Sequence, residues 1–165
     1  MSFSPPMLLY MSNANREGRS MSLHSVSVAG VVVREDGRVL VIKRADNGAW
    51  EAPGGVLELD ERPEDGACRE VLEETGIKVE TERLTGVYKN MKRGVVALVF
   101  RCRVVGGGER TSDESVDVRW FTREEAESHM VEAYAVRVLD ALGTGAPQVR
   151  AHDGRRLLPY GAPAT

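Results

Sequence analysis

Apolar positions in this chain fall into short runs separated by polar turns, which is the pattern typical of β-strands. Residues 25–34 and 39–43 are rich in valine, and Asp36-Gly37 between them is a hairpin turn signal. Residues 94–105 form the most continuous apolar run, so we expect this strand to be buried on both faces. Further strands are predicted at 50–52, 77–88 and 116–121, with Pro53-Gly54-Gly55 ending the first of these.

Three segments carry the signals of helices. Residues 63–75 begin with Pro63, whose missing N–H would have no partner in a first turn, and Gly76 suits the end of that helix. Residues 122–125 read Thr-Arg-Glu-Glu, a capping box that starts a helix ending near His129, and 132–142 predict one more helix. This order predicts one α/β domain in which helices pack on both faces of a mixed sheet.

The two ends of the chain differ in composition from its centre. Residues 1–23 are rich in Ser, Asn, Arg and Gly, so we expect a flexible extension before a domain of residues 24–142. Met21 is an alternative start of the natural chain, and an intact mass would decide between it and Met1. Residues 143–165 are rich in Gly, Pro and Ala, and we expect a weakly structured tail.

Three carboxylates share one face of the first predicted helix. Glu70, Glu73 and Glu74 stand at i, i+3 and i+4, a spacing at which like charges repel by a few tenths of a kcal/mol per pair. A bare acidic face is more often only solvated, but oxygen ligands at this density also suit hard divalent cations such as Mg²⁺ or Mn²⁺. Such ions neutralise a pyrophosphate and activate water, which favours hydrolysis of a phosphoanhydride.

The surrounding residues decide between these interpretations. The chain resembles the Nudix hydrolase superfamily (MutT-like), because it fits the Nudix box G-x5-E-x7-R-E-U-x-E-E-x-G-U at every fixed position, where U is aliphatic. The matching residues are Gly55, Glu61, Arg69, Glu70, Val71, Glu73, Glu74, Gly76 and Ile77. The resemblance implies a single-domain α/β/α sandwich with a mixed, curved β-sheet. It also implies Mg²⁺-dependent hydrolysis of a nucleoside diphosphate linked to a moiety X, such as ADP-ribose, a sugar nucleotide or a nucleoside triphosphate.

The same resemblance assigns expected roles to individual residues. Glu70 and Glu74 are similar to metal ligands of the family, Glu73 to a ligand or the general base, and the carbonyl of Gly54 to a further ligand. Arg69 and Glu61 resemble a pair that positions the carboxylates. Glu114, outside the box, resembles an acidic residue that reaches the metals or acts as the base. Arg62 departs from the usual Ser, Thr or Asp before the helix, so we expect a weaker cap there.

Substrate contacts are open at this point. Trp50 could stack on a base or belong to the core, and Arg44 could contact phosphates. Lys89 begins a basic cluster that is either a solvated turn or an electrostatic clamp on a polyphosphate.

Composition excludes several other functions. The formal net charge is -3, so we expect no bulk nucleic-acid partner, and no apolar run approaches the roughly 20 residues of a membrane span. The chain has 2 cysteines, Cys68 and Cys102, which we expect to be buried thiols of a cytoplasmic protein. No P-loop motif is present. A non-catalytic nucleotide-sensing module and an isomerase of the isopentenyl-diphosphate type are the alternatives, and a homodimer is possible.

Overall fold

The computed structural model describes residues 22–161, so the predicted extension up to residue 23 lies almost wholly outside the described residues. The elements are β1 (Ser25–Val32), β2 (Val39–Arg44), β3 (Trp50–Glu51), β4 (Gly54–Val56), α2 (Pro63–Thr75), β5 (Ile77–Asn90), β6 (Val95–Gly107), β7 (Ser115–Phe121), α3 (Arg123–His129), α4 (Glu132–Leu142) and β8 (Gln148–His152).

The strands form two sheets. One has five strands in the order β4-β1-β6-β5-β8, and the other has three in the order β3-β2-β7. In the larger sheet β1 pairs in parallel with β6, and β5 pairs in parallel with β8, while the remaining pairs are antiparallel. The predicted mixed sheet is therefore confirmed. The turn at Asp36-Gly37 forms and is closed by an isolated bridge between Val33 and Val39, but β1 and β2 belong to different sheets.

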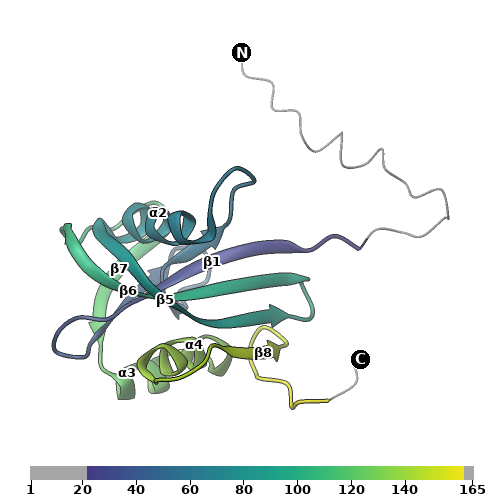
Figure 1. Ribbon diagram of the computed structural model, residues 1–165. Coiled ribbons are helices and arrows are strands. Elements are labelled where there is room, and N and C mark those ends of the chain that lie inside the picture. Colours follow the sequence, from purple (N-terminus) through teal and green to yellow (C-terminus); the bar gives the residue numbers. More distant parts are fainter. Residues whose placement is uncertain (1–21, 162–165) are drawn as a thin grey trace.

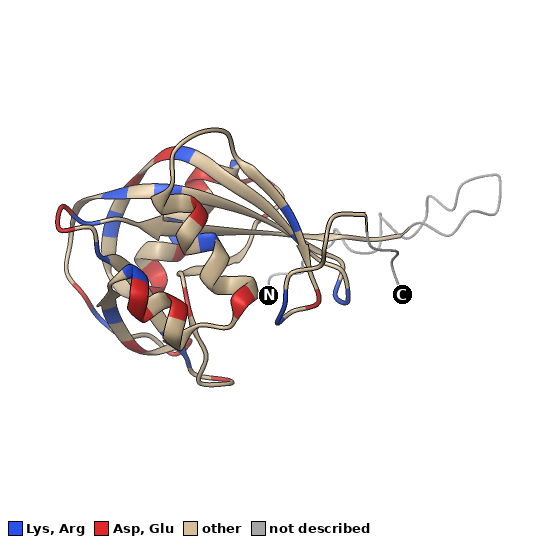
Figure 2. Cartoon of the chain, turned by 90° about the horizontal axis from the view of Figure 1, so that it is seen from below, with Lys and Arg blue, Asp and Glu red and all other residues tan. Residues whose placement is uncertain are grey.

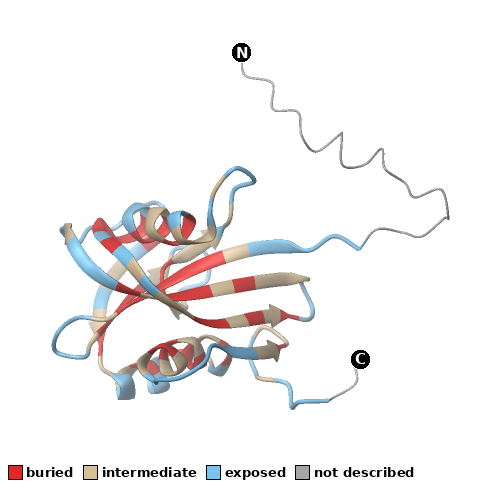
Figure 3. Ribbon diagram, viewed as in Figure 1, coloured by how far each residue is buried: buried red, intermediate tan, exposed pale blue. Residues whose placement is uncertain are grey.

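Helices cover both faces of the larger sheet, as Figure 1 shows, with α2 on one side and α3 and α4 on the other. Alternate residues of β1 enter two separate cores: Val28 and Val32 pack toward α2, whereas Ala29 and Val31 pack toward α4. Figure 3 shows the buried positions concentrated along the middle of the strands. The predicted α/β class with a sandwich of layers is confirmed.

Two strand predictions need correction. Gly54-Gly55 does not simply end a strand, because Gly54–Val56 is β4 and pairs with Ala29, Val28 and Ser27 of β1. The apolar run of β6 is buried only in its middle, around Ala97–Cys102. Val104 and Val105 are exposed, because β6 there runs beyond the cover of the helices.

The segment after Gly143 also differs from the prediction. Gln148–His152 forms β8 beside β5, and His152 is fully buried. The backbone N–H and C=O groups of β5 at this edge supply a partner that composition alone does not reveal. Among the described residues, no helix is long and apolar enough to cross a membrane.

The described surface mixes the two signs of charge. Figure 2 shows basic and acidic residues interspersed over the helices and strands.

Candidate active site

Helix α2 presents two of the three predicted carboxylates to the protein interior. It runs from Pro63 to Thr75, the left-handed backbone of Gly76 (φ 75°) ends it, and Arg62 supplies no side-chain cap, in line with the weaker cap predicted. Glu70 and Glu74 are only 7% and 4% exposed. Val71 is fully buried on the core side. Because successive helical residues are 100° apart, Glu70 and Glu74 point inward together while the helix packs through Val71.

Three further side chains of α2, those of Glu73, Cys68 and Leu72, are more exposed than the sequence suggested. The side chain of Glu73 is 58% exposed and pairs with Arg69 at 3.2 Å. Cys68 is half-buried and packs at the margin of the core, and Leu72 is 37% exposed. Cys102 is buried, as expected.

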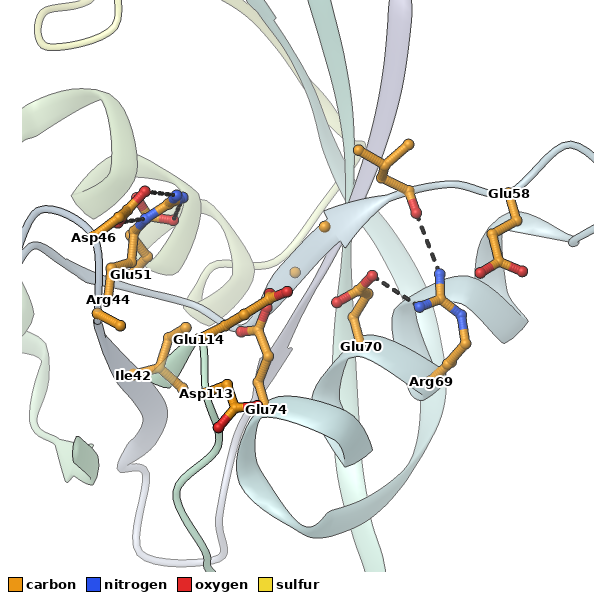
Figure 4. A pocket seen from close by; sticks show the side chains of 14 residues that line it. Ile42, Arg44, Asp46, Glu51, Glu58, Arg69, Glu70, Glu74, Asp113 and Glu114 are labelled. Carbon is orange, nitrogen blue, oxygen red and sulfur yellow. Dashed lines mark hydrogen bonds and ion pairs between the residues drawn. The ribbon is translucent and has the colours of Figure 1, made fainter. Parts of the chain in front are cut away.

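A cleft of about 690 Å³ lies in front of Glu70 and Glu74. Its walls come from α2, β4 and the segments around β2 and before β7, and Figure 4 shows Glu70, Glu74 and Glu114 directed into a shared space. Segments far apart in sequence thus bring several carboxylates together. The acidic residues that line the cleft are Asp46, Glu51, Glu58, Glu70, Glu74, Asp113 and Glu114.

Arg69 is the positive centre of one wall. Its Nε and Nη2 donate to both carboxylate oxygens of Glu61, at 2.6 and 2.9 Å. Its Nη1 donates to Glu70 at 2.9 Å, and Nη2 also reaches the carbonyl of Val56 at 3.2 Å. These bonds lower the pKa of Glu61 and raise that of Arg69. The pair that the resemblance implied is thus in contact, and the planar guanidinium fixes the orientation of Glu70.

Glu74 has the most perturbed carboxyl group of the cleft. Burial is the main cause that raises its pKa to about 8, and the charges of Glu70 and Glu114 add to the shift. A hydrogen bond from the backbone of Gly54 opposes it. The Oε2 atom of Glu74 is buried and has no hydrogen-bond partner among the described residues. A buried acceptor without a donor costs about 1–3 kcal/mol, so this oxygen favours a proton or a cation.

The two glycines of β4 allow the backbone to approach these carboxylates. A Cβ atom at Gly55 would lie 2.5 Å from Oε1 of Glu70, which is closer than real side chains allow. Gly54 pairs with Ala29 and lines the cleft beside Gly55. Any larger residue at position 55 would therefore displace Glu70.

The donors of the cleft suit a hard divalent cation. Carboxylate oxygens of Glu70 and Glu74, the latter with its unpartnered Oε2, and a glycine carbonyl are oxygen ligands of the kind that such ions prefer. Within residues 22–161 no three His, Cys, Asp or Glu side chains converge on one point as they stand. Glu70 is drawn toward Arg69 instead. The residues fit a cation that would gather carboxylates already facing the same cleft.

Glu114 reaches the cleft from the segment before β7. The hydroxyl of the buried Ser115 donates to the backbone oxygen of Glu74 at 2.5 Å, which ties the start of β7 to the end of α2. The amide of Ala45 donates to the carbonyl of Glu114 at 2.9 Å. Glu114 is therefore held beside Glu74, and Asp117 lies farther along β7, where it pairs with Arg119.

Arg44 lies on the opposite wall and is engaged by two acids. It donates to both oxygens of Asp46, at 2.8 and 2.6 Å, and its Nη1 is 3.5 Å from Glu51. Burial raises the pKa of Glu51, whereas Arg44 lowers it. Glu51 was missed in the sequence, where an acid inside the short apolar strand 50–52 was its only signal.

Trp50 and Lys89 do not line this cleft. The ring of Trp50 packs against Phe121, with centroids 4.9 Å apart, at the edge of the core on the α4 side. Lys89 is half-buried on β5, between its strand partners Val96 and Ala151. Tyr88 is buried and donates to Asp140 at 2.7 Å. The structure therefore groups Gly54, Glu70, Glu74, Glu114, Arg69 and Arg44, while Glu73 and Glu61 flank the cleft.

Comparison with known proteins agrees with this geometry. A family model described as NUDIX domain matches residues 23–142. A MutT-like protein of Streptomyces ambofaciens is 65% identical over 155 residues, which cover 94% of this chain and 100% of that protein. An ADP-ribose pyrophosphatase of Methanocaldococcus jannaschii is 32% identical over 106 residues, or 60% of this chain and 63% of that protein.

Solved structures give the same result. A NUDIX hydrolase from Nitrosomonas europaea superposes with a TM-score of 0.71 and 26% sequence identity, over 81% of this chain and 82% of that one. The family match covers the whole segment that carries the cleft from β1 to α4. This chain therefore belongs to the NUDIX family and is a MutT-like pyrophosphohydrolase.

Proposed function

We propose that this protein hydrolyses the diphosphate linkage of a nucleoside diphosphate bonded to a second moiety, with Mg²⁺ as the working cation and Mn²⁺ as a substitute. The observation that carries this proposal is the buried, unpartnered Oε2 of Glu74 in a cleft lined by further carboxylates. The products would be a nucleoside monophosphate and the phosphorylated moiety, or pyrophosphate where the substrate is a triphosphate.

The cation ligands that we propose are Glu70, Glu74 and the carbonyl of Gly54, with Glu73 as an additional ligand or the base. When bound, a divalent cation neutralises phosphate charge and lowers the pKa of a water molecule. Arg69 and Glu61 position Glu70, because the fork of hydrogen bonds from Arg69 leaves Glu70 few orientations.

Two further residues have proposed roles toward the substrate. Glu114 lines the cleft next to Glu74, where its carboxylate could accept a proton from the attacking water. Arg44 lines the opposite wall, where its positive charge would face the diphosphate. The role of Arg44 is supported by its position in the cleft. In the structure its ion-pair partners are Asp46 and Glu51.

A hydrolysis panel tests the proposal. Phosphate release, with a coupled phosphatase where needed, is measured with Mg²⁺ and with EDTA for ADP-ribose, sugar nucleotides, dinucleoside polyphosphates, and normal and oxidised nucleoside triphosphates. We expect Mg²⁺-dependent turnover of one class and none with EDTA. Nucleotide binding by calorimetry without turnover of any compound would contradict the proposal and favour a sensing module.

A further inference from the structure

A second hollow of about 240 Å³ adjoins the acidic cleft. The two share a wall made by Arg44, Glu51 and the β4 segment 54–56. The rest of the second hollow comes from other elements, namely β1, the turn after β5, α4 and β8. Its polar lining residues outside the shared wall are Ser25, Ser27, Asn90, Arg93, Tyr134, Arg137 and His152.

Arg137 of α4 is the least satisfied cation of this hollow. Its guanidinium lies over the rings of Tyr88 and Tyr134, at 5.2 and 4.7 Å from their centroids. Its Nε is buried without a hydrogen-bond partner, and the described part of the chain provides it with no ion pair. The hydroxyl of Tyr88 is already committed to Asp140. A buried guanidinium without an anion is unfavourable unless a ligand completes it.

The side chain of His152 on β8 cannot accept a hydrogen bond from the guanidinium of Arg137. The backbone N–H of Gly154 donates to Nδ1 of His152 at 3.0 Å, so Nδ1 carries the lone pair. Burial and the charge of Arg137 lower the pKa of His152 to about 4, and the ring is therefore neutral at pH 7 with its proton on Nε2. Nε2 lies 3.4 Å from Nη2 of Arg137. Both atoms are then donors, and neither can accept from the other.

The charge of the hollow favours an anionic ligand. Arg44, Arg93 and Arg137 line it, against the single carboxylate of Glu51, which already faces Arg44. An acceptor oxygen that enters the hollow would receive a hydrogen bond from Nη2 of Arg137, and a small displacement of the buried His152 would let Nε2 donate to the same oxygen. Ser25, Ser27 and Asn90 offer neutral hydrogen-bonding groups nearby, so a polar, negatively charged group fits better than an apolar one.

We propose that the second hollow binds a carboxylate or phosphate on the moiety beyond the hydrolysed diphosphate, held by Arg137 with His152 beside it. This inference rests on the proposed function and narrows it to substrates whose second moiety is anionic. Carboxylated sugars and phosphorylated ribose share this chemistry.

Two matched ligand pairs test the proposal on the full-length protein. UDP-glucuronate against UDP-glucose examines a carboxylate, and ADP-ribose 1″-phosphate against ADP-ribose examines a phosphate, each carried by the moiety beyond the diphosphate. Dissociation constants come from calorimetry, and kcat/KM from hydrolysis with Mg²⁺. In at least one pair we expect the anionic member to bind about tenfold or more tightly, as charge-assisted hydrogen bonds provide.

Substitution of Arg137 shows whether this residue causes the preference. Arg137→Met keeps an apolar stem between the tyrosines and should bring the affinities of the pair to within about twofold of each other. Arg137→Lys should retain part of the preference. Arg83→Met is the matched control, because Arg83 binds the carbonyls of Ala141 and Gly143 outside the hollow. It should leave the preference unchanged.

The outcomes separate this proposal from the proposed function. Equal affinity within both pairs, absence of binding by all four compounds, or a preference that survives in Arg137→Met would overturn the second site. Absence of turnover together with a preference that depends on Arg137 would instead contradict the hydrolytic function alone. Nitrogen NMR of the imidazole gives an independent check: His152 should carry its proton on Nε2, and a proton on Nδ1 would overturn the two-donor arrangement.

Discussion

The acidic cleft beside α2 and the second hollow beside α4 share the wall of β4, but their unpartnered groups have opposite charge preferences. In the cleft, Arg69 donates to Glu61, Glu70, Glu73 and the carbonyl of Val56, and the group left unsatisfied is a carboxylate oxygen of Glu74. In the hollow, the unsatisfied group is the guanidinium of Arg137. One region therefore lacks a positive partner and the other lacks an acceptor.

This difference shows that counting charges does not locate a ligand site. Arg69 and Arg137 are the same residue type on helices that cover opposite faces of the sheet (Figure 1). Arg69 donates its hydrogen bonds to groups within the chain and thereby orients the neighbouring carboxylates. Arg137 has an incomplete shell, and buried groups of that kind are where ligands contribute most. We infer that the two regions together suit a cation and an anionic substituent on one substrate.

The largest expected effect comes from removing the unsatisfied group of the cleft. Glu74→Gln should lower kcat/KM by more than about a hundredfold, since the loss of a partner behind a metal ligand alone costs about 10–100-fold. The fold should remain, because a neutral amide replaces a carboxyl group whose burial opposes its charge. Steady-state kinetics and thermal unfolding measure the two properties. Glu124→Gln, on the exposed surface of α3, is the control and should retain full activity.

A smaller effect is expected from replacing Arg69, the arginine whose hydrogen bonds are made within the chain. Arg69→Gln should lower kcat/KM by about 10–100-fold, because Glu70 loses its orientation. It should also lower the free energy of unfolding by about 1–3 kcal/mol, because Glu61 and Glu70 lose charged donors. Denaturant unfolding measures this cost. Arg69→Lys keeps the charge without the fork, so recovery of full activity by Lys would contradict a geometric role.

The pH dependence of stability examines Glu74 in the acidic cleft. In the metal-free protein the pKa of Glu74 is raised from 4.5 to about 8, so the folded state holds a proton that the unfolded chain has released. The free energy of unfolding should therefore be highest below pH 4.5, as far as this group is concerned, and fall as pH rises through 8. Urea unfolding in EDTA at several pH values measures the slope. Glu74→Gln should reduce it, and an unchanged slope would contradict the assignment.

The smallest expected effect concerns the helix ends rather than either site. Arg62 leaves α2 without a side-chain cap, whereas Thr122 caps α3 through a complete capping box. Arg62→Asp should raise the free energy of unfolding by about 1 kcal/mol, and Thr122→Ala should lower it by about 1 kcal/mol. Thermal unfolding at constant pH compares the two variants. Neither should change kcat/KM by more than about twofold, and a larger change would mean that helix positions and the site are coupled.

The cleft was largely predictable from sequence because its main parts are local. The 3.6-residue period places Glu70 and Glu74 together, and Pro63 and Gly76 set the bounds of α2. The second hollow was not predictable, because it depends on the pairing of β5 with β8, whose partners are 62 residues apart, as in Gly86 and Gln148. β8 is a short strand in a glycine-rich and proline-rich segment, and it forms only because β5 offers an edge. The period-two alternation in residues 148–152 was the only signal for it.

The position of Glu51 and the division of the strands into two sheets also depend on pairing between distant strands. Glu51 reaches the cleft because β3 pairs with β2, in a sheet separate from the one that holds β4. Hydrophobic patterning predicts that such strands exist but does not choose their partners.

The most direct test of the central claim is a titration of the full-length protein with Mn²⁺, followed by electron paramagnetic resonance of the free ion. We expect Mn²⁺ to bind to the wild-type protein and Mg²⁺ to compete with it. The affinity for Mn²⁺ should be lowered by about tenfold or more in Glu74→Gln but not in Glu124→Gln. Equal Mn²⁺ affinity in the wild-type protein and Glu74→Gln would contradict this claim, because the unpartnered carboxylate would then have no part in holding the cation.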